Sequence, residues 1–138
     1  MAIQLITPLK ARQSLYSDFH KDMTFNPITN DLALKYDEDS VKESIKNIIL
    51  TDRGERLFQP NLGGDIRAML FENNTPATIK IIQEQVKTVI NSYETRANVI
   101  DVQAISNIDD NNVAVKIIFS IRNREDPVTV TVFLERVR

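Results

Sequence analysis

Apolar residues recur at intervals of three and four along residues 79–93, and this spacing predicts an amphipathic helix. The apolar stripe consists of Ile79, Ile82, Val86, Val89 and Tyr93, and Ile90 widens it. The opposite side carries Lys80, Glu84, Lys87 and Asn91. Thr75 and Pro76 indicate where the helix begins, because a threonine hydroxyl caps the first turn and proline fits there. At 1.5 Å per residue, the helix should be about 27 Å long.

Beyond residue 98 the period of the apolar residues changes to two, which predicts strands. The three alternating sets are Ile100, Val102 and Ala104, then Val113, Val115, Ile117, Phe119 and Ile121, and finally Val128, Val130, Val132 and Leu134. The first set belongs to a strand over residues 99–105, and polar turns at residues 109–112 and 123–127 separate the three strands. Short turns predict an antiparallel meander whose apolar side helices would cover. We expect the last strand, residues 128–138, to be an edge strand that pairs with a neighbouring protein.

A second main helix is predicted before the first one. Ser40 opens it, with Glu43 three residues later, which is the pattern of a capping box. Its apolar stripe consists of Val41, Ile45, Ile48 and Ile49. Gly54 is available for a left-handed cap after the helix. Residues 65–71 are typical of a third, short helix.

The N-terminal part of the chain predicts a β-hairpin. A turn cluster at residues 26–31 precedes an alternating run formed by Leu32, Leu34 and Tyr36. The fold class is therefore α+β, with an antiparallel β-meander packed against two main helices and an N-terminal hairpin. We expect residues 1–15 to be a flexible segment. Residues 16–138 should form a single domain, since 138 residues suffice for one core.

Composition narrows the possible functions. The formal net charge is −2, so a basic surface for nucleic acid or for a membrane is not expected. The absence of cysteine excludes disulfides, thiol nucleophiles and cysteine-based metal sites. No apolar run approaches the roughly 18 residues of a membrane span, and the first ten residues do not resemble a signal peptide. These observations predict a protein of the cytoplasm, or one that leaves it within a larger assembly.

Catalytic chemistry finds little support in the residue pattern. His20 is the single histidine and has no neighbouring metal-ligand pattern, and no phosphate-binding glycine motif or nucleophilic serine motif occurs. Paired carboxylates remain open, because 19 acidic residues offer many combinations. Glu72 follows two apolar residues and could act as the acid of a glycoside hydrolase if a second carboxyl lay nearby. It could equally be a plain acidic residue at a helix end. We expect no catalytic residue, no cofactor, no metal and no small-molecule substrate.

Two segments carry more polar and apolar detail than a spacer needs. The first is residues 53–60, a loop that combines glycine, alternating charges and the Leu57–Phe58 pair. In one interpretation Leu57 and Phe58 anchor the loop to the core while the charges pair locally. In the other the loop contacts a partner through Arg53, Glu55 and Arg56.

The second segment is Glu94-Thr95-Arg96, at the end of the helix that runs to Tyr93. One interpretation is an exposed ion pair at a helix terminus, worth about 0–1 kcal/mol. The alternative is that an extended exit turns both side chains to one face, where a carboxylate and a guanidinium fork bind a partner.

Four stretches occur in order at close spacing and together carry a family resemblance. They are residues 40–51 (SVKESIKNIILT), 53–63 (RGERLFQPNLG), 70–76 (LFENNTP) and 93–96. In this order the chain strongly resembles the small baseplate wedge proteins of contractile-tailed phages and their counterparts in type VI secretion baseplates. The resemblance covers roughly residues 16–138.

The resemblance implies a structural role in the tail baseplate of a virion, assembled in the cytoplasm of the host bacterium. It implies a subunit that joins the core bundle of the wedge to the first sheath ring and templates the sheath by strand addition. Glu94 and Arg96 resemble the family's Glu-Pro-Arg motif, which docks on the core bundle, although Thr95 replaces the proline. The family has also been labelled a tail lysozyme, so peptidoglycan hydrolysis is the alternative function.

Overall fold

The computed structural model describes residues 13–73, 75–107 and 112–135, and these fall into two units. The units are Met1–Ser40 and Val41–Arg138. Most of the segment expected to be flexible, residues 1–12, lies outside the described residues.

The first unit contains the predicted hairpin. Strand β2 (Phe25–Asn26) pairs antiparallel with β3 (Asp31–Leu32), so the turn cluster between them closes a hairpin as predicted. Farther from the turn, β1 (Ser17–Phe19) pairs antiparallel with β4 (Leu34–Tyr36).

Helix α1 (Asp37–Leu50) begins three residues before the predicted position, so the capping box was wrong. The Ser40 hydroxyl lies inside the helix and donates to Asp18 Oδ2 at 2.6 Å. At the true start, the Asp37 carboxylate accepts hydrogen bonds from the N–H groups of Leu15 and Tyr16. Acidic residues fill the first turn, where the helix dipole favours negative charge. A partner 22 residues away in sequence therefore overrides the local capping signal.

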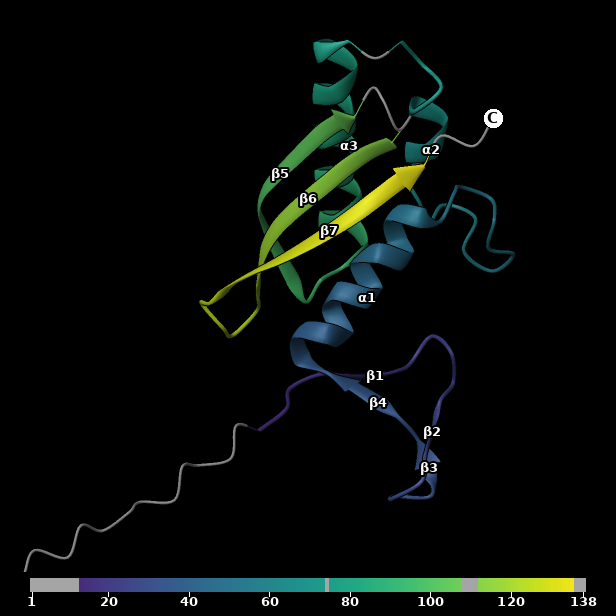
Figure 1. The fold of residues 1–138 in the computed structure, drawn as a ribbon, viewed down its shortest axis with the longest axis vertical. Coiled ribbons are helices and arrows are strands. Elements are labelled where there is room, and N and C mark those ends of the chain that lie inside the picture. Colours follow the sequence, from purple (N-terminus) through teal and green to yellow (C-terminus); the bar gives the residue numbers. More distant parts are fainter. Residues whose placement is uncertain (1–12, 74, 108–111, 136–138) are drawn as a thin grey trace, which may run out of the picture. The chain divides into compact units, whose positions relative to one another are not determined.

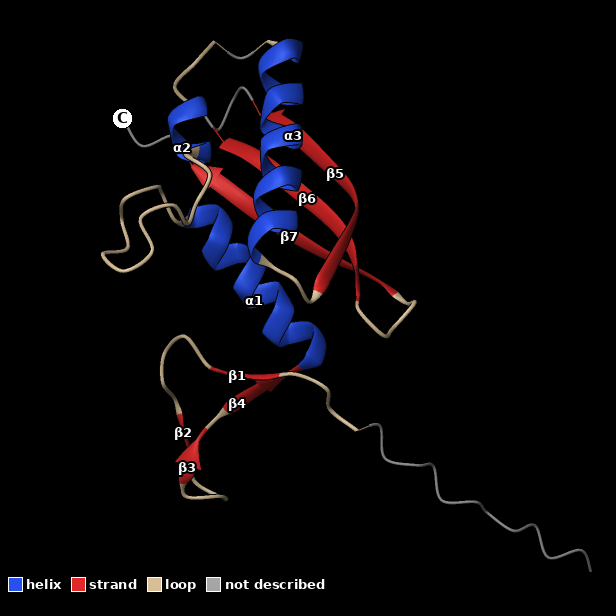
Figure 2. Cartoon of the chain, turned by 180° about the vertical axis from the view of Figure 1, so that it is seen from behind, coloured by secondary structure: helices blue, strands red, loops and turns tan. Residues whose placement is uncertain are grey.

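The second unit is built on a three-stranded antiparallel sheet in the order β5-β6-β7. The strands are β5 (Ala97–Asn107), β6 (Asn112–Ile121) and β7 (Pro127–Glu135). Helix α3 (Pro76–Tyr93) contacts β5 and lies across one face of the sheet (Figures 1 and 2). Along β6 and β7 the predicted alternation is confirmed, because every member of both apolar sets is buried except Val113, which is half-buried at the start of β6.

The start of α3 is confirmed in detail. The Thr75 hydroxyl accepts a hydrogen bond from the Thr78 N–H at 3.2 Å, and Pro76 is the first helical residue. Ile82, Val86, Val89 and Ile90 are buried. The short helix α2 (Ile66–Met69) has only four of the seven residues predicted, and it packs against α3.

Strand β5 departs from the prediction because it contains a β-bulge. The register shifts between Val99, which pairs with Phe119, and Asp101, which pairs with Ile118. The extra residue, Ile100, is exposed, whereas Val99 is buried. A single inserted residue reverses which side chains face the core. The prediction that Ile100 shares a side with Val102 was therefore wrong.

Strand β7 lies at the edge of the sheet. Among the described residues it pairs with β6 alone, so the expectation of an edge position is confirmed. Its side chains alternate strictly, with Val128, Val130, Val132 and Leu134 buried and the residues between them exposed. The side of the sheet that α3 leaves uncovered faces the viewer in Figure 1.

We predict that Phe119→Ala, in the centre of the sheet, lowers the free energy of unfolding by about 3–5 kcal/mol, because it removes a fully buried ring. Phe133→Ala is the matched control, since Phe133 lies on the exposed side of β7. It should change stability by about 0.5 kcal/mol or less. Urea unfolding measures both variants, and equal losses would contradict the assignment of the two faces.

Candidate functional site

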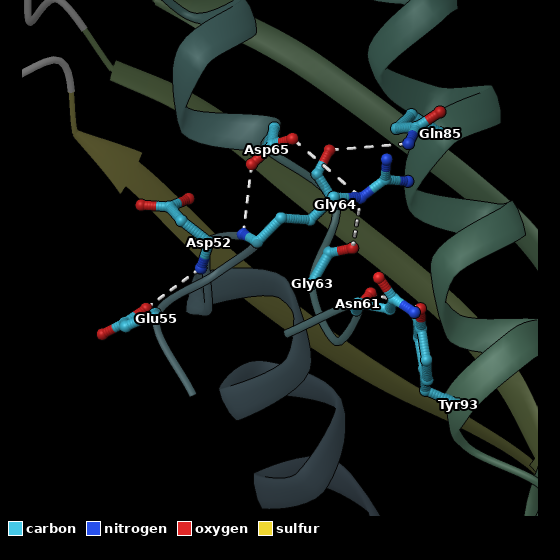
Figure 3. A network of polar contacts seen from close by, with 9 residues as sticks. Asp52, Glu55, Asn61, Gly63, Gly64, Asp65, Gln85 and Tyr93 are labelled. Atoms are coloured by element: carbon cyan, nitrogen blue, oxygen red, sulfur yellow. Dashed lines mark hydrogen bonds and ion pairs between the residues drawn. The ribbon is translucent and has the colours of Figure 1, made fainter. Parts of the chain in front are cut away.

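The segment between α1 and α2 is tied together at its base by main-chain and side-chain hydrogen bonds (Figure 3). The Arg53 N–H donates to Asp65 Oδ1 at 3.1 Å, and the Arg53 Nε–H donates to the Gly63 carbonyl at 3.3 Å. The Gly54 N–H donates to the Pro60 carbonyl at 2.8 Å. These bonds join residues that are 6 to 12 positions apart, so the segment is a closed loop rather than an extended linker.

Two glycines allow this closure. Gly54 has a φ of 83°, so it is left-handed, but it does not cap α1 as predicted, because the helix ends at Leu50 and the Gly54 N–H bonds to Pro60. Gly63 has a φ of 115°, and a Cβ atom there would overlap the Thr51 carbonyl oxygen. Any other residue at position 63 would be strained in φ and would push the two sides of the loop apart.

The end of α3 holds the far side of the loop. The Tyr93 hydroxyl donates to the Asn61 carbonyl, and Gln85 Nε2 donates to the Gly64 carbonyl at 3.5 Å (Figure 3). An open hollow of about 490 Å³ lies where the loop meets the end of this helix, and Phe58, Pro60 and Tyr93 are among the residues that line it. The two segments singled out in the sequence are therefore neighbours, because Tyr93 directly precedes Glu94.

The three charged loop residues do not share one role. The Arg53 side chain is turned toward Gly63 and Asp65 at the base of the loop. The Glu55 carboxylate accepts a hydrogen bond from the Asp52 N–H at 3.0 Å. Arg56 is exposed, and its side chain makes no hydrogen bond or ion pair with the described residues.

Leu57 and Phe58 do not anchor the loop. Their exposed fractions are 92% and 98%, so the interpretation in which they pack into the core was wrong. The glycines, the Arg53 side chain and the Tyr93 hydroxyl hold the loop instead. The glycines of this loop are visible in the sequence, but the contact from Tyr93 joins residues 32 positions apart, and no local pattern indicates it.

Glu94 and Arg96 form an ion pair with each other immediately after α3. Arg96 Nε and Nη2 donate to the two Glu94 carboxylate oxygens at 2.8 and 3.0 Å, and the Arg96 N–H donates to Oε1 at 3.2 Å. The Glu94 side chain is 5% exposed and that of Arg96 is 23% exposed. This geometry differs from both interpretations of the sequence, because the pair is neither fully exposed nor offered as two separate groups.

The surroundings of Glu94 keep its carboxyl ionised. Burial raises the pKa of Glu94, but hydrogen bonds from the Arg96 and Ser44 side chains, together with the positive charge of Arg96, more than offset this effect. The net result is a pKa below the usual value for glutamate. Glu94 is thus a buried anion that holds the Arg96 guanidinium in one orientation.

The described residues give little support for catalysis. Glu72 is exposed in the turn that follows α2. The hollow beside Phe58 has no carboxylate in its lining, and a second hollow of about 370 Å³, beside Phe133, has only that of Glu135. Within residues 13–73, 75–107 and 112–135, no three His, Cys, Asp or Glu side chains gather as they would around a metal ion. None of the helices in these ranges combines the length and hydropathy of a membrane span.

Comparison with known proteins gives a consistent picture. The family model for "Baseplate wedge protein gp25" matches residues 35–126. The chain is 32% identical over 117 residues to the baseplate wedge protein gp25 of Enterobacteria phage T4. That alignment covers 83% of this chain and 86% of the phage protein.

Three solved structures share the fold. The "putative tail lysozyme" of Geobacter sulfurreducens superimposes with a TM-score of 0.68 at 24% identity, over 73% of this chain and 92% of that one. A chain of the anti-feeding prophage baseplate gives 0.61 at 19% identity, over 89% and 87%. A chain of the type VI secretion baseplate gives 0.56 at 17% identity, over 70% and 92%.

We predict that Glu94→Gln destabilises the protein near neutral pH and that the difference from wild type shrinks as the solution is acidified. A carboxyl whose pKa is lowered by folding contributes stability above its unfolded pKa, and this contribution disappears as the pH falls through the folded value. The loss should therefore begin below about pH 4.3, the value of an unperturbed glutamate. Urea unfolding at several pH values measures it.

Glu84→Gln is the control for this experiment, because Glu84 is exposed on α3, the helix that directly precedes Glu94. It should leave stability nearly unchanged across the pH range. A difference for Glu94→Gln that stayed constant down to pH 2 would contradict the role assigned to its charge.

Proposed function

The chain belongs to the baseplate wedge protein gp25 family, and from this membership we propose that it joins the core bundle of the wedge to the first sheath ring. In this role it templates sheath assembly by offering a strand edge. It would act in the tail baseplate of a virion or a related injection machine, after assembly in the host cytoplasm.

The open edge of β7 is the observation that carries this proposal. Strand β7 has nine residues, pairs with β6 alone among the residues that the structure describes, and contains proline only at its first position. An edge strand of this length presents a row of unpaired N–H and C=O groups, which can pair with another chain. Strand addition would satisfy this row, while the exposed side chains Thr129, Thr131 and Phe133 would contact the added strand's neighbours.

The proposed contact with the core bundle lies at the exit from α3, where Glu94 and Arg96 form their ion pair. Arg96 keeps an exposed fraction of 23%, and Glu94 holds its fork in place. We assign the direct contact to Arg96 and a positioning role to Glu94. Arg53 and Glu55 would act in the same indirect way, by shaping the loop that presents Arg56. The pair forms with Thr95 between its members, so the family's proline is not needed to bring the two side chains together.

We propose no enzymatic role. A glycoside hydrolase needs two carboxyl groups facing each other across a cleft. Neither hollow provides two, and Glu72 lines neither of them. The one feature in favour of the hydrolase is the name of the Geobacter protein, which resembles this chain at the level of the fold. Cofactors, nucleic acid and membranes have no part in the proposed function.

We predict that sheath protein from the same machine protects the amides of β7 against hydrogen exchange. In an antiparallel pair every second residue points its N–H away from the partner strand, so these β7 amides are open in the free chain. Strand addition should slow their exchange by at least about tenfold. The β6 amides are the internal control, because β6 is already paired on both sides. Sheath binding without any protection of β7 would refute strand addition.

We predict that Arg96→Ala weakens binding to the purified core-bundle subunits of the same machine by about 30-fold or more, the effect of truncating a charge buried at an interface. Glu94→Gln should weaken binding less, since Glu94 is shielded from a partner by its burial. Both variants disturb the ion pair, so unfolding must be measured alongside binding. If the two binding losses simply follow the two stability losses, the pair is structural only.

A further inference from the structure

The loop between α1 and α2 carries a small exposed group at its outer turn, formed by Arg56, Leu57 and Phe58, which we term the loop tip. Leu57 and Phe58 are the most exposed large apolar side chains among the described residues. They are adjacent in sequence, and neither packs into the core of the same unit. Apolar surface of this size in water is unfavourable, and the fold derives no packing from it.

The loop tip is held in a fixed place despite its exposure. The Gln59 N–H donates to the Arg56 carbonyl at 3.2 Å, which closes a turn around Leu57 and Phe58. Below this turn lies the hydrogen bond from the Gly54 N–H to the Pro60 carbonyl. A side chain presented on a pre-formed turn loses little conformational entropy on binding. Rigidity and exposure together are typical of a group that inserts into a partner.

Charge at the loop tip indicates the chemistry of that partner. The Glu55 carboxylate is occupied by the Asp52 N–H, and the Arg53 side chain is turned toward Gly63. Glu55 and Arg53 keep their charges but are held toward the base of the loop, whereas Arg56 directly precedes the two apolar side chains and is the charged residue of the loop tip. The complementary surface is an apolar socket with a carboxylate at its rim.

We propose that the loop tip inserts Leu57 and Phe58 into an apolar socket on another wedge subunit, with Arg56 facing a carboxylate at the rim of the socket. This inference rests on the proposed function, since it takes another wedge subunit as the occupant. The hollow beside Phe58 borders the loop tip, so the same partner would cover it and the end of α3. The contact would then extend from the loop tip toward Arg96.

The test uses the full chain and the purified wedge subunits of the same contractile machine. Phe58→Ser and Leu57→Ser should each weaken binding, Phe58→Ser by about 30-fold or more, because buried aromatic anchors dominate interfaces. Ile81→Ser is the matched control, since Ile81 is an exposed apolar residue on α3 in the same unit. It should leave binding within about threefold of wild type. All three variants should melt at the wild-type temperature, and a lower melting temperature for the tip variants would mean that these side chains pack within the chain, which overturns the proposal.

Charge reversal tests the rim of the socket separately. Arg56→Glu should weaken binding more than Arg56→Ala, and the gap between the two should narrow at high salt. Equal binding of these two variants would refute the carboxylate at the rim.

The outcomes separate this inference from the proposed function. If wild type binds the wedge subunits and the tip variants bind equally well, the loop tip is not the anchor and the proposed function stands. If the tip variants lose binding to the sheath protein or to a second copy of the chain instead, the wedge socket is wrong. If wild type binds no wedge subunit, both the inference and the proposed function fail.

Discussion

The sheet of the second unit has a single apolar face, and burying that face is the constraint on which the rest of this unit depends. Alternate residues of β6 and β7 contribute to this face, and α3 lies across it. The opposite face of the sheet is not covered by α3. The bulge at Ile100 follows from the same constraint. Because Val99 and Val102 both reach the core, the strand must gain one residue between them, and Ile100 is displaced outward. Among the described residues, the outer face of the sheet and the free edges of its two outer strands, β5 and β7, are then left open.

The loop after α1 differs from the sheet, because it is not ordered by the burial of apolar side chains. Its base is closed by hydrogen bonds and by a glycine that no larger residue can replace without strain, yet its two largest apolar side chains face water. In the sheet, exposure of an apolar side chain is the by-product of alternation. In the loop no alternation forces it, since a turn of this length could as well direct a leucine or a phenylalanine inward. Polar groups order the base of the loop, while Leu57 and Phe58 stay exposed.

Local signals in the sequence were sufficient for α3 and for the alternation of β6 and β7. Thr75 and Pro76 determine where the helix begins through contacts within four residues, and such contacts are readable from the sequence. The failures share a cause, which is the distance along the chain to the deciding partner. Ser40 was assigned to a cap because Asp18, its partner, lies 22 positions away. The bulge in β5 depends on the register with β6, which alternation within β5 does not reveal. At the candidate site, the choice of residues 53–60 and 94–96 was possible from the sequence, but the burial of Glu94 and the exposure of Leu57 depend on packing.

The ion pair at the end of α3 is difficult to explain by stability alone. Removing two charges from water costs free energy that their attraction offsets only when the geometry is good, and an apolar pair of similar size often serves a fold as well or better. Here the geometry around Glu94 is good, because both of its carboxylate oxygens are bonded and the anion is almost fully buried. Arg96 is less buried, so the desolvation is unequally divided between the two residues. An ion pair in which the acid is buried and the base stays partly exposed orients the arginine side chain, as the closed loop holds Phe58 in place. It fixes the direction of a group whose remaining surface is turned outward, at the same end of α3 where Tyr93 meets the loop.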